Sequence, residues 1–151
     1  MMLTARDIMT KDVITVKKET KVSDLAEIFT ISGIGGVPVV DNSGKVIGVV
    51  TESDLVEQSK SLHLPTVFTI LDSVIFLETA KHFEKELKKM TGAKVEDIYT
   101  EGAITVRPDA PVREIATIMA EKKVYTIPVL DGDKLVGVIG KADVVRASAK
   151  G

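Results

Sequence analysis

The apolar positions of this chain follow two spacings, one typical of helices and one typical of strands. Two segments place apolar residues at i, i+3, i+4 and i+7, which predicts an amphipathic helix in each. Their apolar positions are Val22, Leu25, Ala26 and Phe29, and Val112, Ile115, Ala116 and Met119. Short apolar runs rich in β-branched residues predict strands at 14–16, 37–40 and 46–50, and again at 104–106, 127–130 and 135–139. Second helices are expected to begin near Ser53 and Ala142.

These elements form one pattern, β-α-β-β-α, that occurs twice. A shift of 90 residues superimposes Pro38 on Pro128, and after a one-residue gap a shift of 89 superimposes Asp54 on Asp143. Because a unit of about 50 residues would be marginally stable alone, we expect an α+β fold in which two β-α-β-β-α repeats pack by pseudo-twofold symmetry. The expected divisions are a first repeat at 1–58, a helical insert at 59–93 and a second repeat at 94–151.

The insert has its own apolar pattern. Its first part has apolar residues at helical spacing, namely Val67, Ile70, Leu71 and Val74, although 74–77 fits a strand equally well. Residues 78–90 predict a charged helix. The apolar surface of the insert could meet a second subunit, giving a homodimer, or fold onto its own domain. Glu78, His82 and Glu86 share one helix face, but Glu- and Lys-rich helices often produce this spacing, so no metal site is expected.

Composition narrows the class of protein. Of 151 residues, 44% are hydrophobic and 28% are charged, as in globular proteins. The net charge of −2 argues against nucleic-acid binding through bulk charge. The absence of cysteine excludes disulfides, thiolate metal sites and cysteine nucleophiles.

Targeting and catalytic motifs are the next features to consider. The first residues contain no apolar signal segment, and the longest apolar run, 64–77, is interrupted by Asp72 and too short to span a bilayer. These observations predict a cytoplasmic protein without membrane insertion. His63 and His82 lie in no nucleophile motif, and no Lys-Ser/Thr pair follows the glycines at 33–36 to complete a phosphate-binding loop. We therefore expect no enzymatic activity.

Candidate chemistry lies where a strand gives way to a helix in each repeat. These positions are Thr51 and Asp54 in the first repeat, and Gly140 and Asp143 in the second. One interpretation is structural: Thr51 caps its helix, and Asp54 accepts free backbone amides. The other is functional, because a helix start suits a phosphate and a neighbouring carboxylate can accept hydrogen bonds from both hydroxyls of a ribose. Spacing alone leaves both interpretations open.

Here the sequence resembles a known family. The strands Val-Pro-Val-Val at 37–40 and Ile-Pro-Val-Leu at 127–130, and the Gly-Val-Val-Thr-x-x-Asp run at 48–54, are similar to those of tandem CBS domains, the Bateman module. The resemblance implies a regulatory module that binds an adenine nucleotide (AMP, ADP or ATP) between the repeats, with S-adenosylmethionine or NAD as the alternative ligands. It also implies homodimers and a regulated enzyme or transporter as partner. No catalytic cofactor is implied. A ligand-free assembly module is the alternative.

The resemblance also implies roles for particular residues in the first site. Asp54 would hold the ribose diol, and Thr51 the ribose or first phosphate. Lys122 and Lys123, from the second repeat, would meet the phosphates. The base would be lined by Ile14, Thr15 and Val16 on one side and by Ile34, Gly35, Gly36 and Val37 on the other.

The second site departs from this pattern. It keeps Asp143, but Gly140 replaces the threonine and Tyr125 stands where the first repeat has Gly35. Tyr125 could stack on a base or fill the pocket, and Lys141 or Arg146 could supply missing positive charge. The other implied lining residues are Thr105, Val124 and Ile127. We expect two unequal sites, with the one at Asp54 binding phosphate more tightly.

Overall fold

The computed structural model describes residues 2–61 and 93–150. In the first half the elements are α1 (Ala5–Ile8), α2 (Val22–Ser32), β1 (Gly36–Val40), β2 (Val46–Thr51) and α3 (Glu52–Ser61). In the second half they are the 3-10 helix η1 (Val95–Asp97), β3 (Thr100–Glu101), α6 (Val112–Lys122), β4 (Thr126–Asp131), β5 (Lys134–Gly140) and α7 (Lys141–Lys150). The two helical stripes and the four longer predicted strands are confirmed, and the second helices begin one residue earlier than expected.

The predicted strands at 14–16 and 104–106 are reduced to single bridges. Val16 pairs in parallel with Val39, and Val106 pairs in parallel with Val129. Val16 donates its amide to Pro38 at 3.1 Å and accepts the amide of Val40 at 2.9 Å. One residue therefore makes both strand-like bonds, while its neighbours remain irregular.

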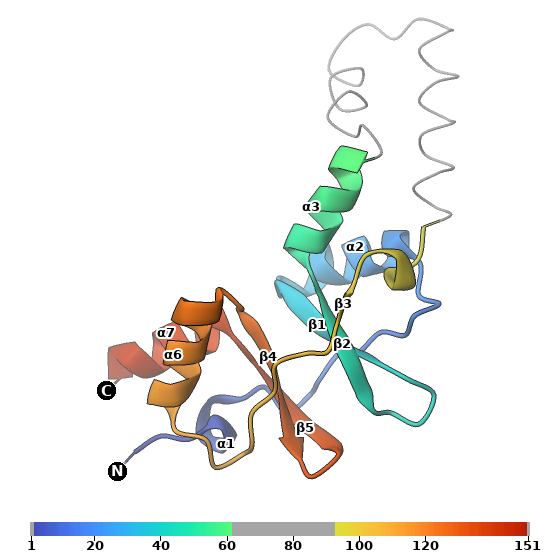
Figure 1. Ribbon diagram of the computed structural model, residues 1–151. Coiled ribbons are helices and arrows are strands. Elements are labelled where there is room, and N and C mark those ends of the chain that lie inside the picture. The colour runs from blue at the N-terminus through green and yellow to red at the C-terminus, as the bar shows by residue number, and fades with distance from the viewer. Residues whose placement is uncertain (1, 62–92, 151) are drawn as a thin grey trace, which may run out of the picture.

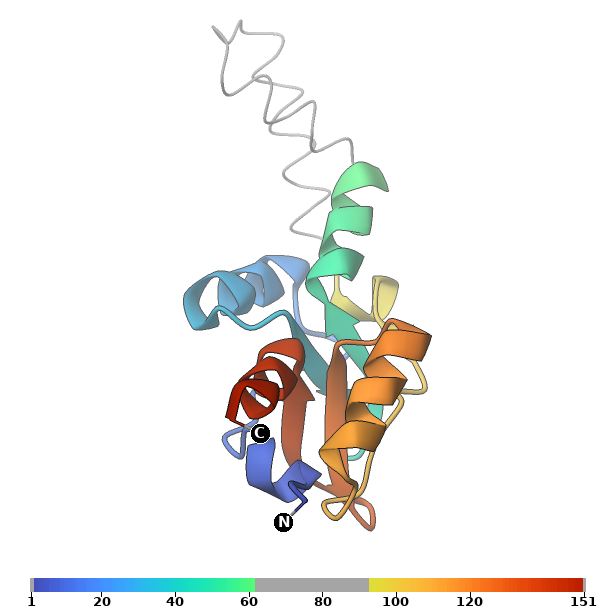
Figure 2. The same ribbon diagram turned by 90° about the vertical axis from the view of Figure 1, so that its left-hand side faces the viewer.

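Each repeat is built on an antiparallel hairpin. Strand β1 pairs with β2, which also pairs with β3, and β4 pairs with β5. Both hairpins have an irregular register at the same place, between Val39 and Val40 and between Val129 and Leu130. In Figures 1 and 2, α6 and α7 cover one face of the β4–β5 hairpin, and the first repeat's strands lie on the other side. The sheets therefore meet in the middle of the molecule.

The meeting point of the hairpins lies close to the pseudo-twofold axis. Gly36 begins β1 and Thr126 begins β4, and the shift of 90 residues makes them equivalent. A Cβ added at Gly36 would overlap the Thr126 side chain. The strands can approach this closely because Gly36 has no side chain.

The segment that precedes each repeat packs on the other repeat. The amide of Ala5 bonds to the carbonyl of Ala110 at 2.8 Å, and Thr10 pairs with Val138. Conversely, the amide of Val95 bonds to the carbonyl of Thr20 at 2.8 Å, and β3 pairs with β2. The divisions 1–58 and 94–151 therefore describe repeats along the sequence, whereas each packed unit contains residues from both halves.

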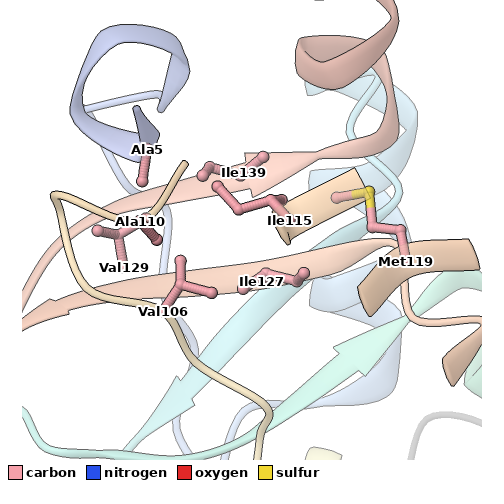
Figure 3. Packing of buried hydrophobic residues seen from close by; sticks show 8 residues of the cluster. All are labelled: Ala5, Val106, Ala110, Ile115, Met119, Ile127, Val129 and Ile139. Atoms are coloured by element: carbon pink, nitrogen blue, oxygen red, sulfur yellow. The ribbon is translucent and has the colours of Figure 1, made fainter. Parts of the chain in front are cut away.

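The hydrophobic cores show the same exchange. Figure 3 shows Ala5 packed with seven buried residues of the second half, which are Val106, Ala110, Ile115, Met119, Ile127, Val129 and Ile139. The other core joins Val95 to residues of the first half, which are Val16, Leu25, Phe29, Val37, Val39 and Val50. Two equivalent glycines, Gly48 and Gly137, leave room for the segments that pack on the opposite repeat. A Cβ at Gly48 would lie 2.6 Å from the Tyr99 ring, and a Cβ at Gly137 would lie 2.7 Å from Met9 Cγ.

Most predictions for the insert fall at 62–92, outside the described residues. These include its two helices and the cluster of Glu78, His82 and Glu86. Within residues 2–61 and 93–150, no helix has the length and apolar character needed to cross a membrane.

Candidate functional site

The first candidate position is the start of α3, where Thr51 and Asp54 bond to each other. The Thr51 amide donates to Oδ2 of Asp54 at 2.8 Å, and the Thr51 hydroxyl is 3.2 Å from the same oxygen. The Asp54 amide in turn donates to the Thr51 hydroxyl at 3.4 Å. This reciprocal arrangement is a capping box, which satisfies amides that a helix start leaves free. The structural role of both residues is therefore present, and it uses one oxygen of the Asp54 carboxylate.

The second candidate position is the start of α7, where both carboxylate oxygens of Asp143 accept hydrogen bonds. The amide of Gly140 donates to Oδ2 of Asp143 at 2.8 Å. Arg146, three residues further along the helix, donates from Nη2 to the other oxygen, Oδ1. The Asp143 side chain is 9% exposed, whereas that of Arg146 is 66% exposed. Both oxygens of the second acid are thus engaged by its own helix.

A cavity of about 1170 Å³ contains both helix starts. The acids on its wall are Asp12, Glu52, Asp54 and Asp143, and the bases are Lys123, Lys141 and Arg146. Three of the four acids come from the first half of the chain, and all three bases come from the second. The cavity wall therefore carries both acidic and basic groups, which a ligand with a sugar at one end and phosphate at the other would require.

Ten of the sixteen predicted site residues line this cavity. From the first repeat they are Ile14, Ile34, Gly35, Gly36, Thr51 and Asp54, and from the second they are Lys123, Val124, Tyr125 and Asp143. The fold thus brings together residues that are about 90 positions apart, and it does so from both repeats.

The other six predicted residues lie outside the cavity wall. Val16, Val37 and Ile127 are 4%, 1% and 0% exposed, because their side chains belong to the two cores. Thr105 is exposed without lining the cavity. Lys122 is in the last turn of α6, and the chain then turns through a left-handed residue, Lys123, with φ of 53°. Only the second of these two lysines lines the cavity.

Thr15 lines a different cavity, of about 720 Å³, at the hairpin turns of the two repeats. Its other lining residues include Lys11, Lys45 and Lys134. In the strand predicted at 14–16, neighbouring side chains would point in opposite directions, and Ile14 and Thr15 do line separate cavities.

A comparison with known sequences identifies the family. A sequence profile described as the CBS domain matches residues 5–61 and 95–150. The chain belongs to the CBS-domain family. The predicted tandem CBS repeats and the α+β architecture are confirmed.

Individual relatives extend over the whole CBS pair. An uncharacterised protein of Methanocaldococcus jannaschii is 28% identical, over 94% of this chain and 89% of that protein. The chloroplastic CBS domain-containing protein CBSX2 of Arabidopsis thaliana is 30% identical over 96% of this chain, which spans 63% of that protein's length. The crystal structure of CBSX2 in complex with AMP gives a TM-score of 0.71 at 27% identity, covering 97% of this chain and 96% of that chain.

The two ends of the cavity between the CBS repeats also differ in shape. A Cβ at Gly35 would meet no atom within 4 Å. At the equivalent position Tyr125 is 45% exposed, and Lys141 Nζ lies 4.9 Å from the centre of its ring. This distance is within the range of a cation–π interaction. Lys141 therefore contacts the tyrosine, a role that the sequence analysis did not assign to it.

Several lining residues were missed by the sequence analysis. Ile104 lines the cavity in place of Thr105, and Asp12 and Glu52 add negative charge to the cavity wall. Ile104 is the equivalent of Ile14, and both apolar side chains are exposed, at 36% and 40%. The alternation of extended chain, applied to both repeats, would have selected Ile104 and excluded Thr105.

Proposed function

We propose that this CBS pair is a regulatory module that binds an adenine nucleotide of the AMP, ADP or ATP class between its repeats. The observation that carries the proposal is the carboxylate of Asp54, which lines the cavity with one oxygen committed to its capping box. Within the described residues, no hydrogen bond is made by its other oxygen. That oxygen can accept the hydroxyls of a ribose.

The walls next to Asp54 suit a flat base. Ile14 and Ile34 offer apolar side chains, and Gly35 leaves the backbone open to a ring. Small-molecule sites usually combine apolar walls with a few polar groups in about 300–1,000 Å³. The cavity, at about 1170 Å³, has room for a nucleotide beside Asp54.

The basic residues of the cavity wall support a ligand that carries phosphate. Lys123 and Lys141 come from the second CBS repeat, whereas Asp54 comes from the first. A nucleotide with its ribose at Asp54 and its phosphates toward these lysines would meet groups of both charges. The similarity to CBSX2, whose crystal structure contains AMP, supports the same class of ligand.

The regulatory part of the proposal follows from the location of the cavity. A ligand that contacts both repeats favours one relative orientation of the repeats, and a partner enzyme or transporter reads that orientation. The ligand shifts this equilibrium only by its difference in affinity for the two orientations.

A homodimer is part of the proposal. Val56 on α3 is 67% exposed, lies outside the cavity wall and would be covered in such an assembly.

A ligand panel tests the proposal. Thermal unfolding would be followed with AMP, ADP, ATP, NAD, S-adenosylmethionine and GTP. A ligand present at 100 times its Kd adds about 2.7 kcal/mol to the free energy of unfolding, which raises Tm by roughly 5–10 °C for a chain of this size. An increase with adenine nucleotides supports the proposal. No increase with any ligand would contradict it and favour the ligand-free assembly module.

A further inference from the structure

The acids at the two helix starts accept the same backbone hydrogen bond but differ in their side-chain hydrogen bonds. Asp54 and Asp143 each accept the amide of the residue three positions earlier, both at 2.8 Å. The remaining oxygen of Asp143 accepts a hydrogen bond from Arg146. Among the described residues, the remaining oxygen of Asp54 accepts none. A ligand hydroxyl would therefore meet an open oxygen at Asp54 and an occupied one at Asp143.

The residue three positions after each acid differs between the two repeats. The shift of 89 residues that superimposes Asp54 on Asp143 also superimposes Glu57 on Arg146. An ionised glutamate has no proton to donate to a second carboxylate, whereas a guanidinium carries five donors. The first helix therefore has an acid where the second has the donor that holds Asp143.

Burial makes the contact at Asp143 hard for a ligand to replace. The Asp143 side chain is 9% exposed, and a buried carboxylate needs a paired charge. Arg146 supplies that charge from the cavity wall with its own side chain 66% exposed. A ribose hydroxyl is a neutral donor and makes a weaker hydrogen bond to a carboxylate than a guanidinium does. A ribose at this position would therefore have to replace a stronger partner of the carboxylate.

We propose that Arg146 blocks the second sugar-binding position by holding Asp143, so that the native chain binds one nucleotide, at Asp54. Arg146 is thus a specificity-determining residue that sets the number of ligands. It serves as a competitor for the acid rather than as a phosphate ligand. This inference rests on the proposed function, because it needs Asp54 to bind a ribose.

The test is a titration of AMP into the full chain by isothermal calorimetry. The native protein should bind one AMP per chain. Arg146→Met keeps the apolar stem but removes the donors, so it should bind two, the second at Asp143. Arg146→Lys keeps a charged donor at the same position and should still bind one. Lys150→Met removes a positive charge from the same helix outside the cavity, and it should also bind one.

The double variant Asp54→Asn with Arg146→Met identifies which acid is used. It should bind one AMP, whereas Asp54→Asn alone should bind at least about tenfold more weakly than the native chain, as expected for the loss of a charge-assisted hydrogen bond. Circular dichroism would confirm that each variant is folded. Two equal sites in the native chain, or a single site in folded Arg146→Met, would overturn the role of Arg146 and leave the proposed function standing. Absence of AMP binding by the native chain would overturn both.

Discussion

Leu25 and Ile115 are equivalent residues of the two CBS repeats, and both are completely buried at the centres of their cores. Asp54 and Asp143 are also equivalent, yet one is half-buried in a capping box and the other is buried and paired with Arg146. The cores are therefore alike and the helix starts are not. The repeats are therefore alike in the residues that hold each unit together and unlike in the residues that face the cavity.

The capping bond itself does not distinguish a ligand site. In the described residues, Asp7, Asp54, Asp97 and Asp143 each accept a backbone amide from three residues earlier at 2.8 Å. Asp54 and Asp143 line the cavity, whereas the wall contains neither Asp7 nor Asp97. An acid at a helix start is thus common in this fold, and its position on the cavity wall is what suggests a ligand.

The largest expected effect is a loss of folding stability that tests whether the two cores are equivalent. Leu25→Ala and Ile115→Ala should each lower the free energy of unfolding by about 2–5 kcal/mol, because each leaves a cavity in a close-packed interior. Urea denaturation would measure both. Ile31→Ala is the control, since its side chain is 77% exposed and should change stability by less than about 0.5 kcal/mol. A large cost at one position and none at the other would show that the cores are not equivalent.

The next effect concerns the difference between the acids. Asp54→Ala should weaken AMP binding by about a hundredfold, because each charge-assisted hydrogen bond contributes about 1.5–3 kcal/mol. Asp143→Ala should leave the affinity at the first site within about threefold, because its carboxylate is held by Arg146. Calorimetry would measure both affinities.

Asp7→Ala is the matched control for Asp54→Ala. It removes the same type of capping bond at α1, outside the cavity, so affinity should not change. Asp54→Ala itself should cost only about 1 kcal/mol of folding stability, as for a lost cap. If Asp54→Ala instead unfolded the protein, the role of Asp54 in capping α3 would explain its presence without a ligand.

The third prediction addresses the contact between the hairpins. Gly36→Ala should lower the free energy of unfolding by about 1–3 kcal/mol, because its Cβ would overlap Thr126. Gly35→Ala, one residue earlier, places its Cβ where no atom lies within 4 Å and should be tolerated. Thermal unfolding would compare the two. Adding Thr126→Ala to Gly36→Ala should recover part of the loss, and failure to do so would show that the contact with Thr126 does not set the cost.

A smaller effect should separate the adjacent lysines at the end of α6. Lys123→Ala should weaken ATP binding by about threefold to tenfold, as expected for one partly exposed charge contact. Adenosine, which has no phosphate, should bind unchanged. Lys122→Ala is the control, because Lys122 lies outside the cavity wall. Equal losses for ATP and adenosine would exclude a phosphate contact at Lys123.

The smallest effect is a pH dependence at a helix start outside the cavity. The Thr4 amide and hydroxyl donate to Asp7 and lower its pKa below the ordinary value. A lowered pKa in the folded state stabilises the fold above the unfolded-state pKa, and this contribution is lost as the pH falls through the folded-state pKa. Carboxylate NMR titration would measure the pKa. Asp7→Asn should remove the loss of folding stability that protonation of Asp7 causes at acid pH. If the free energy of unfolding depended on pH in the same way in Asp7→Asn, Asp7 would not be the group responsible.

The local elements of this CBS pair follow directly from the sequence. The spacing of Val22, Leu25 and Phe29 is sufficient to specify a helix, because an amphipathic stripe depends only on neighbouring residues. The same holds for the hairpin strands and for the capping box of Thr51 and Asp54. Resemblance to the family then located ten residues of the cavity wall, because the segments that carry them recur in both repeats at a nearly fixed offset.

The exchange of the segments before the repeats could not be predicted in this way. Met9 and Tyr99 are equivalent, and so are the glycines that receive them, Gly137 and Gly48. A pattern of apolar residues fits its own repeat and the other repeat equally well, since the repeats are alike. Chain connectivity and the packing of the whole molecule decide between the two arrangements.

The character of the second helix start was also decided by the tertiary structure. The sequence placed Arg146 three residues after Asp143, a spacing that allows contact on a helix, but predicted for it only a supply of missing positive charge. Packing buries the Asp143 carboxylate against its own helix start, where it requires a paired charge. The sequence by itself therefore determined the elements, the duplication and the acid in each repeat. The three-dimensional packing determined how deeply each acid is buried, and hence why Asp143 needs the charge that Arg146 supplies, because burial depends on contacts between residues that are distant along the chain.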